Sequence, residues 1–324
     1  MNPKKTWVII TCLFMFVFSL NAGWQNSGPS VEEIYASIRN SSPQYEWEEC
    51  IVNFTNEGMN LVCTLTVPKS KHKHPIILVL HGFGGDRKGV PITGTTECFW
   101  DPAARILAGQ GFCCLRVDFR GSGESDGTFD ITTFTGQLSD AIAALDFIET
   151  LGKPVHPKKI GLVGHSQGGL VASLTAAADK RIDSTVLWAA TGFPSHDYEG
   201  FLLKQGIKAG LALPDGGIIT LGIYLDGVYL GDVTLGKQFF VELFSIDPLA
   251  ALRGYEKPLM YVSPTQDVVV WPQPLVGEAF LRYHDGEEKL ITLDAGHNYN
   301  YYIGPDKIED AAYWTTAWFI KTLK

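Results

Sequence analysis

A five-residue sequence, Gly164-His165-Ser166-Gln167-Gly168, constrains the fold of this chain more than any other segment. Lys159 to Val163, just before it, has the pattern of a buried β-strand, and Gln167 to about Ala178 has that of a helix. A turn that joins a strand directly to a helix is sharp, so its serine has a strained backbone and a side chain lifted clear of the sheet. The two glycines let strand and helix pack without Cβ clashes. A glycine-rich turn without catalytic meaning is the alternative, but the context favours a reactive Ser166 beside a helix N-terminus.

Apolar segments and helical patterns alternate along most of the chain. Tyr45 to Phe54 and Asn60 to Val67 have the pattern of two strands of a hairpin. Further strands are expected at residues 75–80, 112–117, 159–163, 184–190, 258–263 and 289–293, and helices at 101–108, 133–151, 167–178, 274–283 and 307–323. This alternation predicts an α/β domain with a mostly parallel central sheet and helices on both faces.

The alternation stops between Thr191 and about Asp247. Asp215-Gly216 and Asp226-Gly227 occur in this stretch beside apolar, β-prone residues, which is a strong hairpin signal. We therefore expect a small cap insertion at about residues 191–247 that contains hairpins instead of a long amphipathic lid helix. The chain is then one domain with a cap.

The N-terminus has the pattern of a secretory signal. Lys4 and Lys5 precede an apolar run from Trp7 to Leu20, and small residues follow it. We expect residues 1–22 to be a signal peptide, residues 23–324 to be the mature domain, and the protein to be secreted or periplasmic. Membrane anchoring by an uncleaved signal is the alternative, although the run is shorter than the ~20 apolar residues of a typical span.

Charge and composition limit the partners. The 324 residues include 26 Lys+Arg and 35 Asp+Glu, which gives a formal net charge of −9. This acidic balance argues against a phosphate-binding surface, so we expect no nucleic acid partner. The cysteines show no CxxC spacing and form no metal-ligand pattern with the eight histidines, so we expect no metal and no cofactor.

Removal of the signal would leave an odd number of cysteines: Cys50, Cys63, Cys98, Cys113 and Cys114. At least one thiol would therefore stay unpaired or pair outside the chain. Cys50 and Cys63 flank the turn of the first hairpin and could face each other across it. We favour the alternative that most of these residues are small buried apolar side chains, and leave the pairing open.

A serine hydroxyl is a poor nucleophile unless a base takes its proton. Asp267 and His297 each follow a late strand, just past its C-terminal end, where open α/β sheets build their sites. The chain order serine, acid, histidine fits a catalytic triad on this architecture. We expect Ser166 as nucleophile, His297 as base and Asp267 as the acid that orients the histidine. Asp294 is the rival acid, but it is tied too closely to the histidine's own loop.

The glycine-rich sequence His81-Gly82-Phe83-Gly84-Gly85 follows the first long parallel strand. Its backbone amides can turn inward and donate to an oxyanion. The expected pair of donors is the N–H of Phe83 and the N–H of Gln167. We expect His81 to brace the turn and not to react.

Several motifs together resemble one superfamily. HGFGG at 81–85, DFRGSGES at 118–125, GHSQGG at 164–169, a late Asp and a Gly-His near the end look like the α/β-hydrolases. Within them the chain is similar to the cinnamoyl (feruloyl) esterase branch, related to dienelactone hydrolases and prolyl oligopeptidase-type peptidases. The resemblance implies an α/β-hydrolase fold with a compact insertion after the sixth strand. The chain departs from it in the secretion signal and in Ser263-Pro264, where many relatives carry His-Gly.

The motifs and the resemblance imply a serine hydrolase that cleaves carboxylic esters of small molecules through an acyl-enzyme. A serine peptidase or other acyl hydrolase on the same triad is the alternative among enzymes, and a non-catalytic binding module is the alternative of another class. The insertion is rich in aromatic residues, which suits a hydroxylated aromatic acyl group such as a feruloyl or cinnamoyl group. Tyr198, Tyr224 and Tyr229 are the candidate substrate contacts, with packing of the cap onto the core as the alternative role for each.

Overall fold

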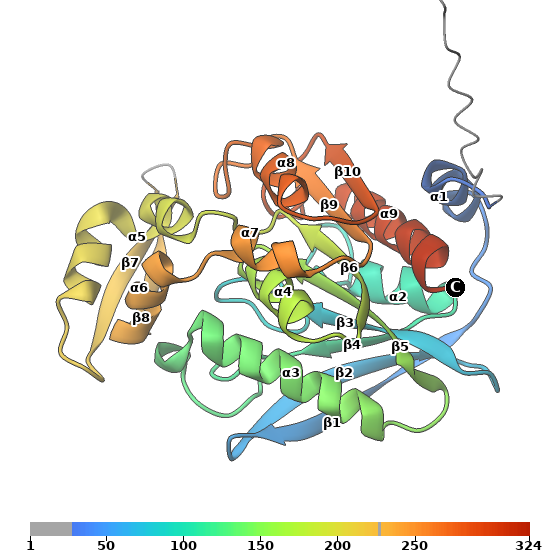
Figure 1. Cartoon of the computed structure of the whole chain (residues 1–324), viewed down its shortest axis with the longest axis horizontal. Coiled ribbons are helices and arrows are strands. Elements are labelled where there is room, and N and C mark those ends of the chain that lie inside the picture. The colour runs from blue at the N-terminus through green and yellow to red at the C-terminus, as the bar shows by residue number, and fades with distance from the viewer. Residues whose placement is uncertain (1–27, 226–227) are drawn as a thin grey trace, which may run out of the picture.

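The computed structural model describes residues 28–225 and 228–324 (Figure 1). The predicted signal segment, residues 1–22, lies outside the described residues. The strands are β1 (Trp47–Asn56), β2 (Met59–Pro68), β3 (His74–Leu80), β4 (Cys113–Val117), β5 (Val155–His165), β6 (Ile182–Trp188), β7 (Ile218–Leu225), β8 (Val228–Gly236), β9 (Leu259–Pro264) and β10 (Glu288–Leu293). The helices are α1 (Val31–Arg39), α2 (Asp101–Gly109), α3 (Phe134–Thr150), α4 (Gln167–Ala178), α5 (Pro194–Leu211), α6 (Lys237–Ser245), α7 (Pro248–Ala251), α8 (Leu275–Arg282) and α9 (Asp306–Leu323), with short 3-10 turns η1 (Phe129–Ile131) and η2 (Leu252–Gly254).

The main sheet has the strand order β1-β2-β4-β3-β5-β6-β9-β10. The strand β2 runs antiparallel to both of its neighbours, β1 and β4, and the other neighbouring pairs are parallel. The predicted mostly parallel sheet is therefore confirmed. Its central strands β3 and β4 are buried along their whole length, which explains their continuous apolar sequences.

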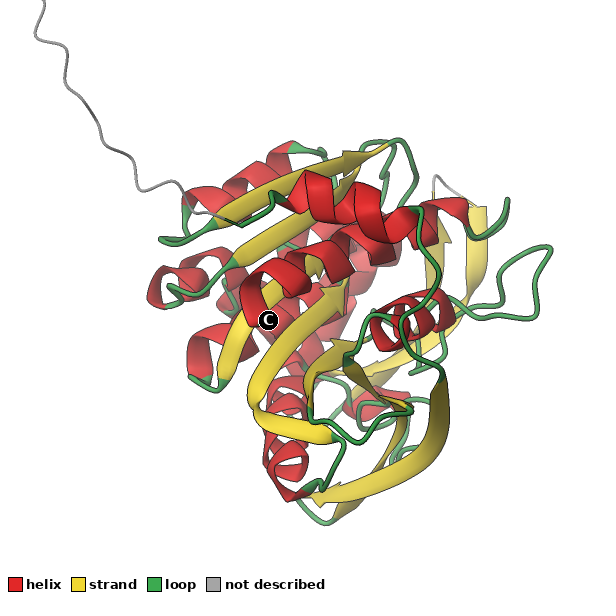
Figure 2. Cartoon of the chain, turned by 90° about the vertical axis from the view of Figure 1, so that its right-hand side faces the viewer, coloured by secondary structure: helices red, strands yellow, loops and turns green. Residues whose placement is uncertain are grey.

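Helices cover both faces of this sheet (Figure 2). On one face, α1, α2 and α9 contribute apolar residues such as Leu107 and Trp318 to a common core. On the other face, α3, α4 and α8 contribute residues such as Leu145, Leu170 and Phe280. The five predicted helices agree with α2, α3, α4, α8 and α9 to within one residue at each end. The amphipathic helix pattern was therefore sufficient to place them.

The insertion between β6 and β9 forms a cap at one end of the main sheet (Figure 1). It contains the antiparallel β7–β8 hairpin, as expected, and the helices α5 and α6 on either side of it in sequence. The helix α5 at residues 194–211 was not predicted, and it is kinked at Leu203, where φ is 59° and ψ is 150°. The Asp215-Gly216 turn connects α5 to β7, while Asp226-Gly227 falls outside the described residues.

Glycine explains why α5 could not be predicted. Gly206 and Gly210 lower the intrinsic helix propensity of the segment, so its sequence resembles a loop. In the fold they allow close packing: a Cβ on Gly210 would lie 2.3 Å from the Phe240 ring, and one on Gly206 would lie 3.1 Å from Leu221. The helix α5 therefore depends on its contacts with β7 and α6 within the cap.

A buried carboxylate attaches the cap to the core. Glu242 of α6 is 1% exposed, and one of its oxygens accepts a 3.0 Å hydrogen bond from the N–H of Thr135. Its second oxygen accepts from the Thr135 hydroxyl at 2.5 Å. Thr135 lies in the first turn of α3, where the helix dipole favours negative charge. The position of the cap is thus fixed to the same helix that packs beside α4.

Candidate active site

Ser166 lies at the turn between β5 and α4 in a strained backbone conformation, with φ 56° and ψ −121°. Gly164 and Gly168 are required here because there is no room for a Cβ atom at either position. A Cβ on Gly164 would lie 2.1 Å from the Gly168 carbonyl oxygen, and one on Gly168 would lie 2.3 Å from the Leu80 carbonyl oxygen. The backbone N–H of Ser166 donates to the Trp188 carbonyl at 2.9 Å, which anchors the turn to β6. The sharp turn expected from the sequence is present.

The structure brings Ser166, His297 and Asp267 into one hydrogen-bonded row. The Nε2 atom of His297 lies 2.9 Å from the Ser166 Oγ, and its Nδ1 atom lies 2.8 Å from Asp267 Oδ2. The three residues follow β5, β10 and β9, and the C-terminal ends of these parallel strands meet at one edge of the sheet. This arrangement can pass the serine proton to the imidazole while the carboxylate stabilises the resulting charge.

The carboxylate of Asp267 is held in place by backbone hydrogen bonds. Its side chain is fully buried, and its Oδ1 accepts hydrogen bonds from the N–H groups of Val269 at 2.8 Å and Val270 at 2.9 Å. Backbone donors of this kind stabilise the charged form of a buried carboxylate. Asp294, the rival acid, is an exposed residue, and it is Asp267 that pairs with the histidine.

His165 holds the loop that carries the histidine. Its Nε2 lies 3.1 Å from the backbone carbonyl oxygen of His297, and burial lowers the pKa of His165 to about 3. The proximity of the His297 ring is a second, smaller cause of this lowered pKa. His165 therefore stays neutral at physiological pH and can donate its ring N–H to that carbonyl without competing for the serine proton.

The loop after β3 lies directly against the nucleophile. A Cβ on Gly82 would lie 3.2 Å from the Ser166 Cβ, so glycine is needed for this approach. His81 braces the loop: its Nδ1 is 2.8 Å from the Gly82 carbonyl, and its Nε2 accepts the Phe119 N–H at 3.2 Å. Burial lowers the pKa of His81, which favours the neutral form that this pair of bonds requires. The loop that carries Phe83 thus lies against Ser166, and Gln167 follows Ser166 in sequence.

Gln167 is fixed by a buried hydrogen-bond chain. Its side-chain Oε1 accepts from the Tyr198 hydroxyl, and its Nε2 donates to Gln137 Oε1 at 2.8 Å. Gln137 donates in turn to the Thr132 hydroxyl at 3.2 Å. All four side chains are buried. As the first residue of α4, Gln167 also has a backbone N–H without an acceptor in its own helix.

The sequence analysis did not predict these hydrogen bonds, because Tyr198 belongs to the cap and contacts Gln167 only when the cap packs on the core. Its ring also packs edge-on against Phe83, with ring centroids 5.4 Å apart. Tyr198 therefore contacts both Gln167 and Phe83.

A cleft of about 220 Å³ opens over Ser166 and His297. The apolar side chains that line it come from the core loops and from the cap: Phe83, Val90, Phe99, Trp100, Phe201, Leu225, Leu230 and Val269. None of the three predicted tyrosines is among the lining residues. Tyr198 is buried with its hydroxyl bonded to Gln167, while Tyr224 and Tyr229 pack on each other on the hairpin with ring centroids 5.7 Å apart. The structure therefore does not bring these tyrosines to the nucleophile.

The cysteines of the described residues are free thiols. Cys63 is opposite Val52 in the first hairpin and Cys50 is opposite Leu65, so the two cysteines are not paired across it. Burial raises the pKa of Cys63, Cys113 and Cys114, as expected for thiols in an apolar core. Cys50 is exposed.

Within residues 28–225 and 228–324 there is no group of three or more histidine, cysteine or acidic side chains placed to hold a metal ion. The helices of this same part of the chain are all too short or too polar to cross a membrane.

Comparisons with known proteins agree with this geometry. Residues 77–311 match the model of a family described as alpha/beta hydrolases. An uncharacterized 31.7 kDa protein of Escherichia coli, from the traX-finO intergenic region, is 34% identical over 131 residues. That match covers 40% of this chain and 42% of the relative, so the chain spans less than half the length of this curated protein.

Two solved structures extend the likeness over most of this chain. Est1E from Butyrivibrio proteoclasticus, with ferulic acid bound, is 25% identical, with a TM-score of 0.62 over 80% of this chain and 96% of its own. The esterase domain of a Rhodothermus marinus protein is 20% identical, with a TM-score of 0.63 over 86% of this chain and 100% of its own. At that identity the second likeness shows the fold alone.

The Tyr198→Phe variant tests the buried hydrogen bond between Tyr198 and Gln167. Loss of the hydroxyl leaves the Gln167 amide oxygen buried without its partner, so we expect the free energy of unfolding to fall by about 1–3 kcal/mol. Urea unfolding followed by circular dichroism measures it. Tyr302→Phe is the matched control, since Tyr302 is 62% exposed and should change stability little. Equal stability of the two variants would contradict the importance of this hydrogen bond.

Proposed function

The chain belongs to the alpha/beta hydrolase family, and we propose that it is a serine hydrolase that cleaves carboxylic esters of small molecules. The observation that carries the proposal is the hydrogen-bonded row of Ser166, His297 and Asp267 at the open edge of the sheet. The likeness to Est1E, which is 25% identical, supports the same class of reaction.

In the first half of the reaction, His297 Nε2 takes the proton from Ser166 Oγ as the oxygen attacks the ester carbonyl carbon. Asp267 holds the imidazole through Nδ1–H and stabilises its positive charge. The N–H groups of Phe83 and Gln167 donate to the oxygen that becomes negative. When the tetrahedral intermediate collapses, the C–O bond to the alcohol breaks and His297 gives its proton to the departing alcohol.

In the second half, water attacks the acyl group on Ser166. His297 takes a proton from that water, and the same two N–H groups bind the new oxyanion. Collapse breaks the bond to Ser166 Oγ, which recovers the proton from His297 and releases the carboxylic acid. No metal or cofactor is needed for either step.

We propose an aromatic acyl group as the preferred acid. The cleft over Ser166 offers the rings of Phe83 and Phe201, whose centroids are 5.6 Å apart, together with four aliphatic side chains. Rings of this kind form offset or edge contacts with an aromatic ligand. The ferulic acid bound to Est1E supports an acid of this class. Phe201 belongs to the cap, so the insertion takes part in the choice of substrate.

We also propose that the protein is exported and that residues 1–22 are removed, on the strength of the basic and apolar pattern that ends at Ala22. N-terminal sequencing of protein recovered outside the cytoplasm of a bacterial host should find a start near Gly23. Exported protein that retains Met1 to Leu20 would contradict cleavage.

Substitutions in the triad test the mechanism. Ser166→Ala, His297→Ala and Asp267→Asn should each lower kcat on an activated ester by about 10⁴-fold or more. A double variant should lose little more than its worse single variant, because the three groups act as a unit. Stopped-flow assays of ester cleavage measure these effects. Asp294→Asn is the control and should keep near-normal turnover.

Retention of turnover by Asp267→Asn, with loss in Asp294→Asn, would show that the acid is assigned wrongly. Folded wild-type protein without any ester or peptide cleavage would favour the binding module instead.

The acyl preference is tested with methyl esters of hydroxycinnamic acids and of octanoic and longer acids. We expect the aromatic esters to have the higher kcat/KM, and Phe201→Ala to reduce this advantage by roughly tenfold through lost ring contact. Phe244→Ala is the matched control, because Phe244 is a 62% exposed cap residue outside the cleft. Faster cleavage of the long aliphatic esters by both variants and wild type would contradict the aromatic preference and support only an esterase without it.

A further inference from the structure

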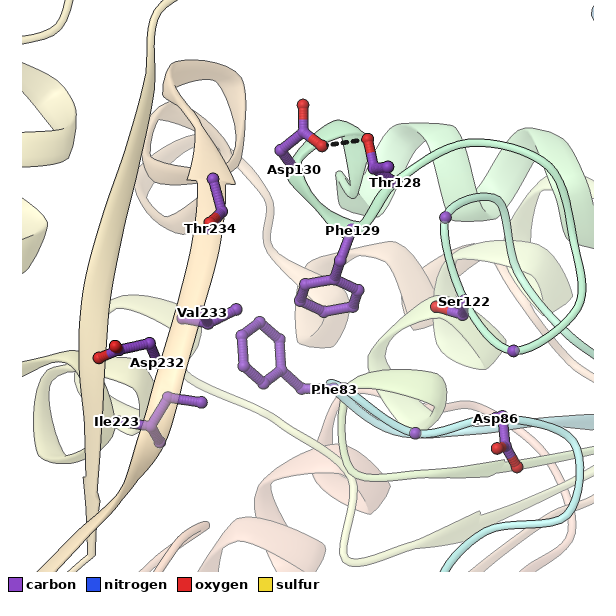
Figure 3. A pocket seen from close by; sticks show the side chains of 14 residues that line it. Phe83, Asp86, Ser122, Thr128, Phe129, Asp130, Ile223, Asp232, Val233 and Thr234 are labelled. Carbon is purple, nitrogen blue, oxygen red and sulfur yellow. Dashed lines mark hydrogen bonds between the residues drawn. The ribbon is translucent and has the colours of Figure 1, made fainter.

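A second cavity lies beside the cleft, between the β7–β8 hairpin and two core loops (Figure 3). Its volume is about 710 Å³, which is within the range of sites for small organic molecules. Residues 83–86, the loop beside Ser166, line both cavities. The two cavities are therefore neighbours that share this loop as a wall.

The centre of the second cavity is apolar and aromatic. The rings of Phe83 and Phe129 pack edge to face with centroids 5.1 Å apart, and Val233 and Ile223 of the hairpin lie opposite them (Figure 3). Such a surface suits a hydrocarbon or aromatic body, and the ring faces also attract a cation.

The rim carries charge of one sign. Asp86, Asp130 and Asp232 line the cavity, while no lysine, arginine or histidine is among its lining residues in the described part of the chain. Figure 3 places the three carboxylates around the edge and not among the rings. Their combined field favours a cationic group and disfavours a carboxylate or phosphate in the cavity.

One buried hydroxyl in the wall lacks a partner. Ser122 is 6% exposed, and its Oγ has no hydrogen-bond partner among the described residues. Figure 3 shows this oxygen turned toward the cavity and the Phe129 ring. An unpaired buried hydroxyl is costly, so its persistence points to a ligand that supplies the missing hydrogen bond.

We infer that the second cavity binds an apolar or aromatic group that carries a primary ammonium, as the part of the substrate remote from the ester. The ammonium donates a hydrogen bond to Ser122 Oγ within the field of the rim carboxylates. The hydrocarbon body packs on Phe83, Phe129 and Val233. The substrate role rests on the proposed ester hydrolysis, whereas the binding itself does not.

Calorimetry tests binding without turnover. Phenethylammonium and 2-phenylethanol have nearly the same shape and differ in charge, and both are titrated into wild-type protein and Ser166→Ala at low salt. We expect the cation to bind about tenfold more tightly to both proteins, and added salt to reduce the difference. Equal affinity of the two compounds, or no binding of the cation, would overturn the inference whether or not the protein is an esterase.

Variants locate the binding. Asp130→Asn and Asp232→Asn should each weaken phenethylammonium binding severalfold, while Glu199→Gln should leave it unchanged. Glu199 is an exposed carboxylate of the same cap, and it does not line the cavity. An equal loss in Glu199→Gln would mean that only the net charge matters, and would overturn the site.

The Ser122→Ala variant distinguishes an effect on ligand binding from an effect on the stability of the fold. It removes the unpaired hydroxyl, so Tm should stay the same or rise while phenethylammonium binding weakens. Phenethyltrimethylammonium has no N–H and should be indifferent to this substitution. Unchanged binding of the primary ammonium would overturn the role of Ser122.

Kinetics test the substrate role. Benzoate esters of ω-amino alcohols are compared with esters of the methyl-terminated alcohols of equal length, over a series of chain lengths. We expect a severalfold lower KM for the ammonium ester at the lengths that reach the cavity, with kcat unchanged, and loss of this preference in Asp232→Asn. Equal KM values at every length would overturn the substrate role.

Discussion

The strained turn at Ser166 is the constraint on which the rest of the site depends. Its φ of 56° is tolerated because the surrounding packing leaves the chain no alternative. The backbone of Gly168 touches the carbonyl groups of Leu80 and His81 at the end of β3, where a Cβ would approach them to 2.3 Å and 2.5 Å. One contact therefore sets the positions of the nucleophile, the helix N-terminus behind it and the loop that carries Phe83.

The order of the strands then brings the remaining groups to this turn. β3, β5, β6, β9 and β10 are consecutive in the sheet and parallel, so the loops after their C-terminal ends meet at one edge. His297 and Asp267 reach Ser166 from loops that are more than a hundred residues away in sequence. Neutral His165 and the N–H groups of Val269 and Val270 hold the histidine and the acid in place.

Much of this arrangement could be predicted from the sequence because it follows from local patterns. The helical patterns placed five helices to within a residue, and the positions of Asp267 and His297 after strands predicted that they would approach Ser166. The cap could not be predicted in the same way. Its helix α5 contains glycines that disfavour a helix in isolation, and it forms through packing on Leu221 and Phe240.

The tyrosines of the cap show the same limit. Composition favoured Tyr198, Tyr224 and Tyr229 as substrate contacts, but which side chains face the cleft depends on how the hairpin and α5 pack on the core. Packing turns Phe201, Leu225 and Leu230 toward the cleft, and places Tyr198 against Gln167 instead. A pattern of aromatic residues therefore does not predict which cavity its members line.

On the proposed function, the cap separates the choice of substrate from the chemistry. Phe201 of α5 and the hairpin ends at Leu225 and Leu230 line the cleft over Ser166, whereas Ile223, Asp232 and Val233 of the same hairpin line the second cavity. Every member of the triad lies outside the insertion. Substitutions in the hairpin can therefore alter the charge and size of the second cavity without moving the serine. Tyr198 of α5 and Glu242 of α6 differ from the hairpin residues, because they join the cap to Gln167 and to α3 and changes at these two positions reach the core.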